Sequence, residues 1–205
     1  MKVTAIDGPS GVGKSTLARK LSKNFNIPYL DTGKMYRAFS YLCLKRKIDI
    51  LKENEVSKIL PDYNEIFPSI SIEILNSEEI GKCASIVAQY KSVREKMKDL
   101  QRNFGLKYPA VVEGRDTTTV LFPETPFKFY LYAKKEVRVW RRYKQINGNW
   151  GKISIEIEER DKRDKERKLA PLKLSDSSIP IDTSNLNENE VFKLVLKLLK
   201  KMGYK

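Results

Sequence analysis

The sequence contains no histidine and only two cysteines among its 205 residues. Histidine is the side chain that most often acts as a general base, so the chemistry has to proceed without it. Two cysteines, Cys43 and Cys83, indicate neither a disulfide framework nor a zinc cluster. We therefore expect a reduced, cytoplasmic protein in which both thiols behave as small core residues.

Long hydrophobic runs are also absent. No stretch approaches the roughly 18 apolar residues that a membrane-spanning helix needs. The opening residues 1–8 (MKVTAIDG) reach an acid and a glycine too soon for a signal peptide, and they favour a buried strand. With 40% hydrophobic and 32% charged residues, the chain has the composition of one globular domain without a membrane partner.

Positive charge is in excess. Forty Lys and Arg residues against 26 Asp and Glu residues give a net charge of +14. This balance suits a nucleic-acid-binding protein, and it also suits an enzyme whose substrates are multiply phosphorylated. Charge alone does not choose between them, because lysines such as Lys193, Lys197, Lys200 and Lys201 also solvate the outer faces of helices.

Short apolar segments alternate with longer helical patterns, which predicts α/β units around a parallel sheet. The predicted strands are 3–6, 28–30, 109–112, 127–132 and 178–181. A helix is predicted at 15–25, and a terminal helix is predicted from the apolar stripe between Val191 and Leu199, with Asn187 and Glu190 as its capping pair. We expect a three-layer α/β fold in which a five-stranded parallel sheet has helices on both faces.

The stretch between a helix ending near Lys47 and the strand at 109 breaks this alternation. It contains helical patterns at 52–60, 78–89 and 92–104 and an alternating apolar piece at Ile70, Ile72 and Ile74. We expect a small insertion of mixed structure, about 52–104, within a single domain.

Residues 8–15 (GPSGVGKS) fit the pattern G-x-x-x-x-G-K-[ST], directly after a predicted strand and at the start of a predicted helix. The glycines allow backbone N–H groups to surround the β-phosphate, and Lys14 neutralises the β- and γ-phosphates. Ser15 ligates Mg²⁺ and Thr16 reaches the α-phosphate. A chance match has odds on the order of 1%. The predicted ATP-binding residues are Gly8, Pro9, Ser10, Gly11, Val12, Gly13, Lys14, Ser15 and Thr16.

A second motif, 30–37 (LDTGKMYR), lies where the second predicted strand gives way to a helix. Tyr36 and Arg37 on the first turns of that helix are suited to clamp a second anion. Alone this signal is weak, because a helix N-cap at Asp31 followed by a solvated arginine has the same pattern.

Two further motifs narrow the function. Residues 112–117 (VEGRDT) and 159–167 (ERDKRDKER), with the two motifs above, closely resemble the bacterial cytidylate kinases. The resemblance continues in order through 120–123 (VLFP), 141–144 (RRYK), 170–173 (APLK) and 181–184 (IDTS). It implies an enzyme that transfers the γ-phosphoryl group of ATP to CMP or dCMP, giving ADP and CDP or dCDP.

The resemblance also implies an acceptor site. Arg37 and Arg115 match positions that hold the acceptor phosphate, for which the guanidinium fork is suited. Ser85, Arg94 and Asp116 match positions that read cytosine, whose amine a carboxylate accepts, whereas uracil presents a carbonyl there. The implied CMP-binding residues are Asp31, Thr32, Tyr36, Arg37, Ser85, Arg94, Arg115, Asp116, Asp164 and Arg167.

Ile153, Ile157, Arg160, Asp164 and Arg167 follow a 4, 3, 4, 3 spacing along one predicted helix. An apolar face that continues into charged residues needs a partner for them. The resemblance assigns Asp164 to the ribose, and Arg160 and Arg167 to the sugar and the transferring phosphate. The alternative is a surface stripe of intrahelical ion pairs, such as Arg160 with Asp164. The implied catalytic residues are Lys14, Arg115, Arg160 and Arg167.

A basic segment, 134–144, precedes an Asn147-Gly148-Asn149 break. Its charged members are Lys134, Lys135, Arg138, Arg141, Arg142 and Lys144. We predict a lid, about 134–160, that closes over ATP and excludes water, with solvated helix charges as the alternative.

The missing histidine is consistent with this reaction. The nucleophile is a phosphate oxygen, and a phosphate monoester with a second pKa near 6 is already ionised at pH 7. Catalysis then consists of aligning two anions and neutralising charge with Lys14, Mg²⁺ and arginines. Glu113 is suited to hold a water on Mg²⁺, at a position where related enzymes often have Asp.

The chain departs from the family pattern at two places. It reads Thr117-Thr118-Thr119 where the family commonly has an apolar residue and a glycine before the last threonine. The insertion is also short around 74–79. Because this region covers the acceptor base, the sequence defines the preference among CMP, dCMP and UMP less well than the reaction type.

Three other functions compete. A kinase for UMP or AMP is disfavoured by Asp116 and Arg94. A P-loop ATPase stimulated by nucleic acid is mildly favoured by the charge, but the sequence has no nucleic-acid-binding signature. A catalytically inactive module is disfavoured because Lys14, Ser15, Arg37, Arg115 and Arg167 are present. We expect a monomer that binds ATP and CMP and no specific nucleic acid.

Overall fold

The computed structural model describes residues 2–60 and 70–204. The chain divides into two compact units. The first unit comprises residues 1–30 and 105–205, and the second comprises residues 31–104. Residues 61–69 of the predicted insertion lie outside the described part of the chain.

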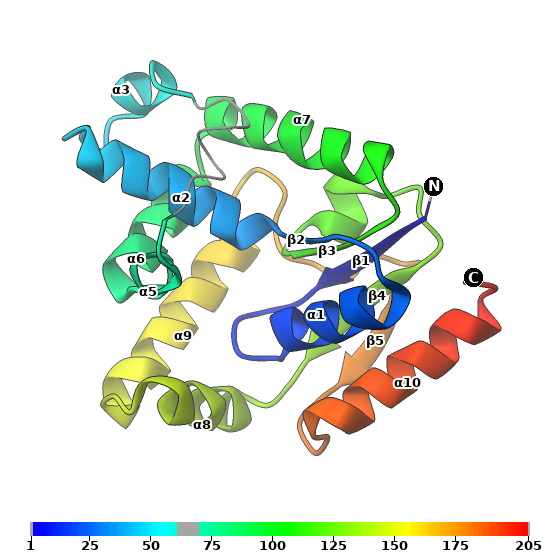
Figure 1. Cartoon of the computed structure of the whole chain (residues 1–205). Coiled ribbons are helices and arrows are strands. Elements are labelled where there is room, and N and C mark those ends of the chain that lie inside the picture. Colours follow the sequence, from blue (N-terminus) through cyan, green and yellow to red (C-terminus); the bar gives the residue numbers. More distant parts are fainter. Residues whose placement is uncertain (1, 61–69, 205) are drawn as a thin grey trace. The chain divides into compact units, whose positions relative to one another are not determined.

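The first unit is built on a five-stranded sheet with the strand order β2-β3-β1-β4-β5 (Figure 1). Its strands are β1 (Val3–Asp7), β2 (Tyr29–Asp31), β3 (Ala110–Gly114), β4 (Lys128–Tyr132) and β5 (Ile179–Asp182). β1 pairs in parallel with β3 and β4, and β4 pairs in parallel with β5. The predicted parallel α/β sheet is confirmed, and each predicted strand ends within two residues of the observed one.

Helices and a short π-helix surround this sheet. They are α1 (Lys14–Phe25), η1 (Thr117–Leu121), α8 (Lys135–Ile146), α9 (Trp150–Glu166) and α10 (Glu188–Lys201). α1 and α10 pack together on the sheet, where Leu21 and Leu199 share a core with Phe129. The predicted capping pair of α10 is confirmed, because Asn187 and Glu190 each accept a hydrogen bond from the other's backbone N–H.

The second unit is helical. It contains α2 (Thr32–Lys45), α3 (Glu53–Ser57), α5 (Ile72–Asn76) and α6 (Glu78–Val87), and α7 (Lys91–Lys107) begins in it. α2 packs against α5 and α6. The alternating pattern at Ile70, Ile72 and Ile74 does not form a strand, because Ser71 caps a helix by accepting from the N–H of Ile74 at 3.3 Å.

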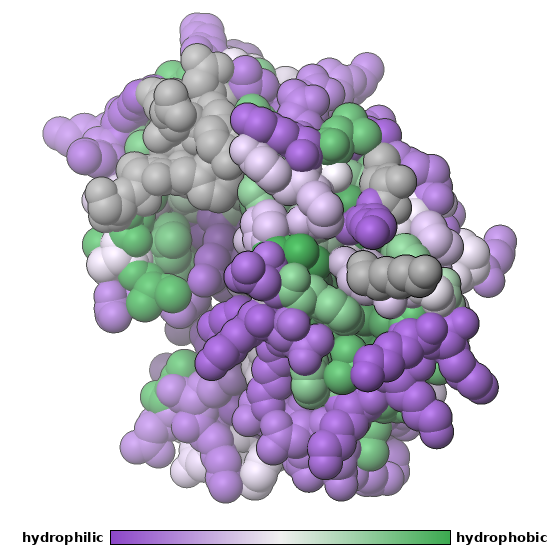
Figure 2. Space-filling view, turned by 45° about the vertical axis from the view of Figure 1, so that its right-hand side comes forward, coloured by the Kyte–Doolittle hydropathy of each residue, from purple (hydrophilic) through white to green (hydrophobic). Residues whose placement is uncertain are grey.

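The surface matches the composition. Figure 2 shows hydrophilic side chains over most of the visible face, with apolar residues in separate patches. None of the helices within residues 2–60 and 70–204 combines the length and the apolar character that crossing a membrane requires.

Candidate active site

The predicted phosphate loop joins β1 to α1. Gly8, Gly11 and Gly13 have φ angles of 148°, 79° and 94°, which side-chain-bearing residues rarely adopt. Gly8 also passes so close to β4 that an added Cβ would lie 2.1 Å from the carbonyl oxygen of Leu131. The loop therefore wraps tightly at the start of α1, where the backbone N–H groups without helical partners favour an anion.

These glycines yield a matched pair of variants. Gly8→Ala is expected to destabilise the protein by about 3 kcal/mol, because the new methyl group meets a backbone oxygen that cannot move away. Gly13→Ala has no atom within 4 Å of its Cβ, so it carries only the cost of a positive φ, about 1 kcal/mol. Urea denaturation of both variants checks this order, and equal losses would contradict the close contact with β4.

Lys14 is buried at the base of this loop. Its Nζ donates a hydrogen bond to the carbonyl oxygen of Pro9 at 2.8 Å, and its exposed fraction is 6%. Burial, followed by the positive charge of Arg115, lowers the pKa of Lys14 to about 7, and Arg160 acts in the same direction. Glu113 opposes them. A buried lysine among arginines favours the arrival of negative charge, which the phosphates of a nucleotide supply.

The residues next to Lys14 fit a magnesium ion. Mg²⁺ takes one or two protein oxygens together with phosphate and water, so a dedicated cage of carboxylates is not required. Ser15 supplies a hydroxyl on the first turn of α1, and the buried Glu113 at the end of β3 supplies a carboxylate oriented by the Tyr29 hydroxyl at 2.8 Å. Their hard oxygen donors suit Mg²⁺.

Two buried ion pairs join the segment after β3 to the region of α9. Arg115 Nε lies 2.7 Å from Asp164 Oδ2, and Arg167 Nη2 lies 3.2 Å from Asp116 Oδ1. All four side chains are at most 15% exposed. The structure thus brings together four residues that the resemblance assigns to the acceptor nucleotide.

Two residues of the predicted charged stripe, Asp164 and Arg167, have ion-pair partners outside α9. Within α9, Arg163 pairs with Glu159 at 3.5 Å, whereas Asp164 and Arg167 pair with residues far away in the sequence. Arg160, one helical turn before Asp164, also helps to lower the pKa of Asp164. The prediction of one continuous helix through Arg167 is wrong by one residue. α9 ends at Glu166, and Arg167 has an extended backbone that is anchored by donation to the carbonyl oxygen of Ala170 at 2.7 Å.

Asp164 keeps its charge in this environment. Burial alone would raise the pKa of Asp164, but Arg115, Arg160 and Arg167 outweigh burial and hold the pKa below its ordinary value. The carboxylate is therefore ionised throughout the physiological range and can accept hydrogen bonds from hydroxyl groups.

Asp7, the last residue of β1, is a feature that the sequence patterns did not single out. Its buried carboxylate accepts hydrogen bonds from Thr117 and Thr118, the first two residues of the unusual threonine run. The available signal was an acid that ends an apolar strand directly before a phosphate loop. Its partners lie more than 100 positions away, so no local sequence pattern connects it to them.

The remaining predicted acceptor residues lie in the second unit. Arg37 donates to the carbonyl oxygens of Leu75 and Ser77 at 2.6 and 3.3 Å. Arg94 is buried, donates to the carbonyl oxygen of Ala88 at 3.1 Å, and has its Cζ 5.9 Å from the centre of the Tyr36 ring.

Three further predicted residues are placed by local contacts in this unit. Asp31 caps α2 by accepting from the N–H of Lys34 at 3.0 Å, so the N-cap role of this motif is confirmed. Thr32 is buried in the first turn of α2, and Ser85 Oγ donates to the carbonyl oxygen of Lys82 at 2.8 Å. These contacts leave the nucleotide roles of the three residues as predictions.

Two arginines of the basic segment 134–144 make structural contacts. Arg138 lies 2.6 Å from Asp161 Oδ2 and donates to the phosphate-loop carbonyl of Ser10 at 3.2 Å. Arg141 donates to Thr183 Oγ1 at 3.0 Å and to the carbonyl oxygen of Leu186 at 3.2 Å. The predicted lid thus begins with side chains that tie α8 to the phosphate loop and to the segment after β5.

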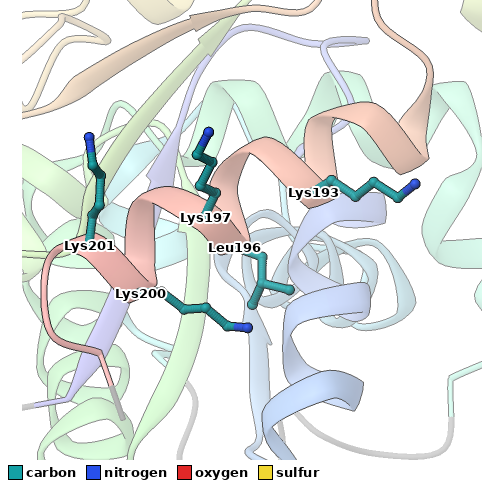
Figure 3. A pocket seen from close by; sticks show the side chains of 5 residues that line it. All are labelled: Lys193, Leu196, Lys197, Lys200 and Lys201. Atoms are coloured by element: carbon teal, nitrogen blue, oxygen red, sulfur yellow. The ribbon is translucent and has the colours of Figure 1, made fainter.

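A pocket on α10 is separate from these residues. Figure 3 shows four lysines and Leu196 lining it on a single helix. The lining residues are Lys193, Leu196, Lys197, Lys200 and Lys201. All four lysines are exposed, as on the outer face of any amphipathic surface helix, and none of them belongs to the predicted site.

A phosphate loop between a central parallel strand and a helix, with a buried lysine and arginine–carboxylate pairs beside it, defines a P-loop nucleotide-binding protein equipped for phosphoryl transfer. The family model described as "Cytidylate kinase" matches residues 4–201. This chain belongs to the cytidylate kinase family.

Similar proteins cover nearly the full length of the chain. A cytidylate kinase of Clostridioides difficile is 38% identical over 95% of this chain and 96% of the relative. A cytidylate kinase of Thermodesulfovibrio yellowstonii is 39% identical over 96% of both chains. A crystal structure of an uncharacterized protein from Eubacterium ventriosum has a TM-score of 0.61 at 12% identity, covering 98% of this chain and 99% of that one, which supports the fold alone.

Proposed function

We propose that this chain is an ATP-dependent kinase of CMP and dCMP. The observation that carries the proposal is the pair of residues after β3, Arg115 and Asp116, with their buried partners Asp164 and Arg167. β3 is the parallel neighbour of β1, so its carboxyl end lies beside the phosphate loop. Nucleotides bind at this edge of α/β sheets.

The proposed mechanism needs no protein base. The acceptor phosphate is ionised at pH 7, and its oxygen attacks the γ-phosphorus of ATP while the bond from that phosphorus to the β,γ-bridging oxygen breaks and ADP leaves. Lys14, at the base of the loop, neutralises charge on the phosphoryl group in transit, and Arg115, Arg160 and Arg167 neutralise charge from the other side. Mg²⁺ at Ser15, with Glu113 orienting a bound water, would add charge neutralisation on the β- and γ-phosphates.

The choice of cytosine rests on Asp116. Its carboxylate is an acceptor, which fits the exocyclic amine of cytosine and leaves the carbonyl of uracil without a donor. Arg167 holds this carboxylate from one side at 3.2 Å, so the orientation of Asp116 does not depend on the ligand alone. Arg94, in the second unit, is proposed to donate to the ring nitrogen and carbonyl of the base.

The experiment that tests the proposed function is a panel of acceptors. ADP production from ATP and Mg²⁺ is measured with CMP, dCMP, UMP, AMP, GMP or no acceptor. The expected result is that CMP and dCMP are the best substrates and that turnover without acceptor is negligible. A preference for AMP or GMP would contradict the acceptor, and acceptor-independent turnover stimulated by nucleic acid would contradict the reaction.

Asp116→Ala is expected to reduce the preference for CMP over UMP by roughly 10- to 100-fold, because the donor–acceptor match to cytosine is lost. The KM for ATP should stay near the wild-type value. Asp161→Ala is the matched control, since it removes the carboxylate of another arginine pair, at 2.6 Å, in the same unit. Steady-state kinetics with both acceptors check this, and equal losses on CMP and UMP would contradict the role of Asp116 in reading the base.

A further inference from the structure

The proposed mechanism assigns no role to the buried carboxylate of Asp7. Each of its oxygens accepts two hydrogen bonds from one threonine. Oδ1 accepts from the N and Oγ1 of Thr117 at 2.9 and 2.6 Å. Oδ2 accepts from the N and Oγ1 of Thr118 at 2.8 and 2.7 Å. We call Asp7, Thr117 and Thr118 the aspartate clamp.

Asp7 lies beside both ends of the two-residue segment Arg115–Asp116. In the pairing of β1 with β3, Asp7 lies directly opposite Gly114, the last residue of β3. The chain then leaves the sheet for Arg115 and Asp116 and is caught by the Asp7 side chain at Thr117. The Arg115–Asp116 dipeptide is thus anchored before and after by the same residue.

The anchoring residue also directly precedes the phosphate loop. Asp7 is followed by Gly8, whose backbone leaves no room for a side chain against β4. The loop that holds the donor phosphates and the segment that contacts the acceptor are therefore fixed to one point at the end of β1. Such a common anchor fixes the separation of the two substrates, and reacting groups misplaced by about 1 Å cost on the order of 100-fold in rate.

The threonine run departs from the family pattern, and its hydroxyl groups donate two of the four hydrogen bonds that Asp7 accepts from Thr117 and Thr118. Thr117 and Thr118 are 0% and 1% exposed, and each hydroxyl donates to the same Asp7 oxygen as the backbone N–H of its own residue. A glycine or an apolar residue at these positions would leave only the backbone donors. Thr119, the next residue, has a buried hydroxyl with no hydrogen-bond partner among residues 2–60 and 70–204.

We propose that Asp7 is a positioning residue for the acceptor site, and that its contacts with Thr117 and Thr118 set the place of Arg115 and Asp116 relative to the phosphate loop. This inference rests on the proposed function, since it assumes that Arg115 and Asp116 bind the acceptor nucleotide.

The test compares hydroxyl deletions that keep the side-chain shape. The double variant Thr117→Val with Thr118→Val removes both clamp hydroxyls, and the double serine variant at the same positions restores them. Thr119→Val is the matched control, because it removes an adjacent buried hydroxyl that donates to no described residue. The readouts are kcat and KM for CMP, UMP and ATP, together with the melting temperature of each variant.

The double valine variant is expected to raise the KM for CMP by about tenfold and to lower the CMP-over-UMP ratio by a similar factor. Its KM for ATP should change by less than about twofold, and the double serine variant should recover the CMP kinetics. Wild-type-like kinetics with only a lower melting temperature would overturn the inference, because the clamp would then be purely structural. Failure of the serine variant to restore the CMP kinetics would overturn it as well.

The failure of the proposed function has a different signature. If the wild-type protein does not use CMP, the proposed acceptor is wrong, whatever the clamp variants do. The aspartate clamp is then judged by the same comparison on the monophosphate that the wild type does use. An unchanged KM for that acceptor in the double valine variant would overturn the positioning role by itself.

Discussion

Lys14→Met is expected to lower kcat by about 1,000-fold while it stabilises the nucleotide-free protein. The loss of activity follows from the removal of the only positive charge that the phosphate-loop motif itself supplies to the phosphoryl group. The gain in stability follows from burial, since Lys14 is 6% exposed and lies close to Arg115. A methionine side chain fills the same space without a charge.

The pH dependence of this gain follows from linkage. The pKa of Lys14 is about 7 in the folded protein, against an ordinary lysine value of 10.5. Between these values the unfolded chain binds more protons, so stability rises with pH. The destabilising contribution of Lys14 is therefore largest below pH 7 and disappears as the pH approaches 10.5. At pH 7 the difference between the two pKa values corresponds to a gain of about 4 kcal/mol.

Urea denaturation of the wild type and of Lys14→Met at pH 6.5 and pH 9 measures this effect. The difference between the two proteins should be larger at pH 6.5. Lys20→Met on the same helix is the control, because Lys20 is paired with Glu188 at 3.4 Å at the surface and should change neither activity nor the pH dependence. A Lys14→Met protein that is less stable than the wild type at both pH values would contradict a Lys14 destabilised by burial.

Asp164→Asn is expected to have the second largest effect. The substitution keeps the shape of the side chain but removes its negative charge. It therefore breaks the ion pair in which Asp164 Oδ2 lies 2.7 Å from Arg115 Nε. Arg115 then remains buried beside Lys14 without its ion pair, although the negative charges of Glu113 and Asp161 still act on it. This loss should lower the free energy of unfolding by about 3 kcal/mol. Because Arg115 is proposed to hold the acceptor phosphate, the KM for CMP should rise by roughly tenfold or more.

Glu159→Gln on the same helix is the control for Asp164→Asn. Glu159 pairs with Arg163 at 3.5 Å and is 59% exposed, so its loss should change stability by less than about 0.5 kcal/mol. Chemical denaturation and steady-state kinetics of both variants check the prediction. If Asp164→Asn were as mild as Glu159→Gln, the ion pair with Arg115 would not be the contact that holds this site.

The sequence predicted the sheet and the phosphate loop well because both depend on local signals. Mostly apolar runs of three to six residues bounded by turns locate the strands, and the spacing of Gly8, Gly13 and Lys14 places the loop between β1 and α1. The N-terminal cap of α10 was readable for the same reason. Asn187 and Glu190 are three residues apart and complete each other's hydrogen bonds.

Contacts between distant segments could not be predicted from the sequence. The alternation of Ile70, Ile72 and Ile74 is compatible with a strand, but three apolar residues do not define one by themselves. Ser71 instead caps the helix α5, which begins at Ile72. Only the folded chain shows that Asp164 pairs with Arg115, because the arginine i−4 to Asp164, Arg160, offered an equally plausible partner in the sequence.

Asp7 was missed for the same reason. A single acid in a buried strand has no pattern of its own, and the threonines that satisfy it appeared only as a departure from the family. In the folded chain, Thr117 and Thr118 donate hydrogen bonds to Asp7, so the threonine run and this aspartate form one cluster.

The most direct test of the central claim is to follow the label of [γ-³²P]ATP in the presence of CMP and Mg²⁺. We expect the wild-type protein to move the label to CMP and form labelled CDP, and Lys14→Met to do so at a rate lower by about three orders of magnitude. Label that appears in inorganic phosphate at the same rate with and without CMP would show that the phosphate loop serves ATP hydrolysis, and would contradict the assignment of a CMP kinase.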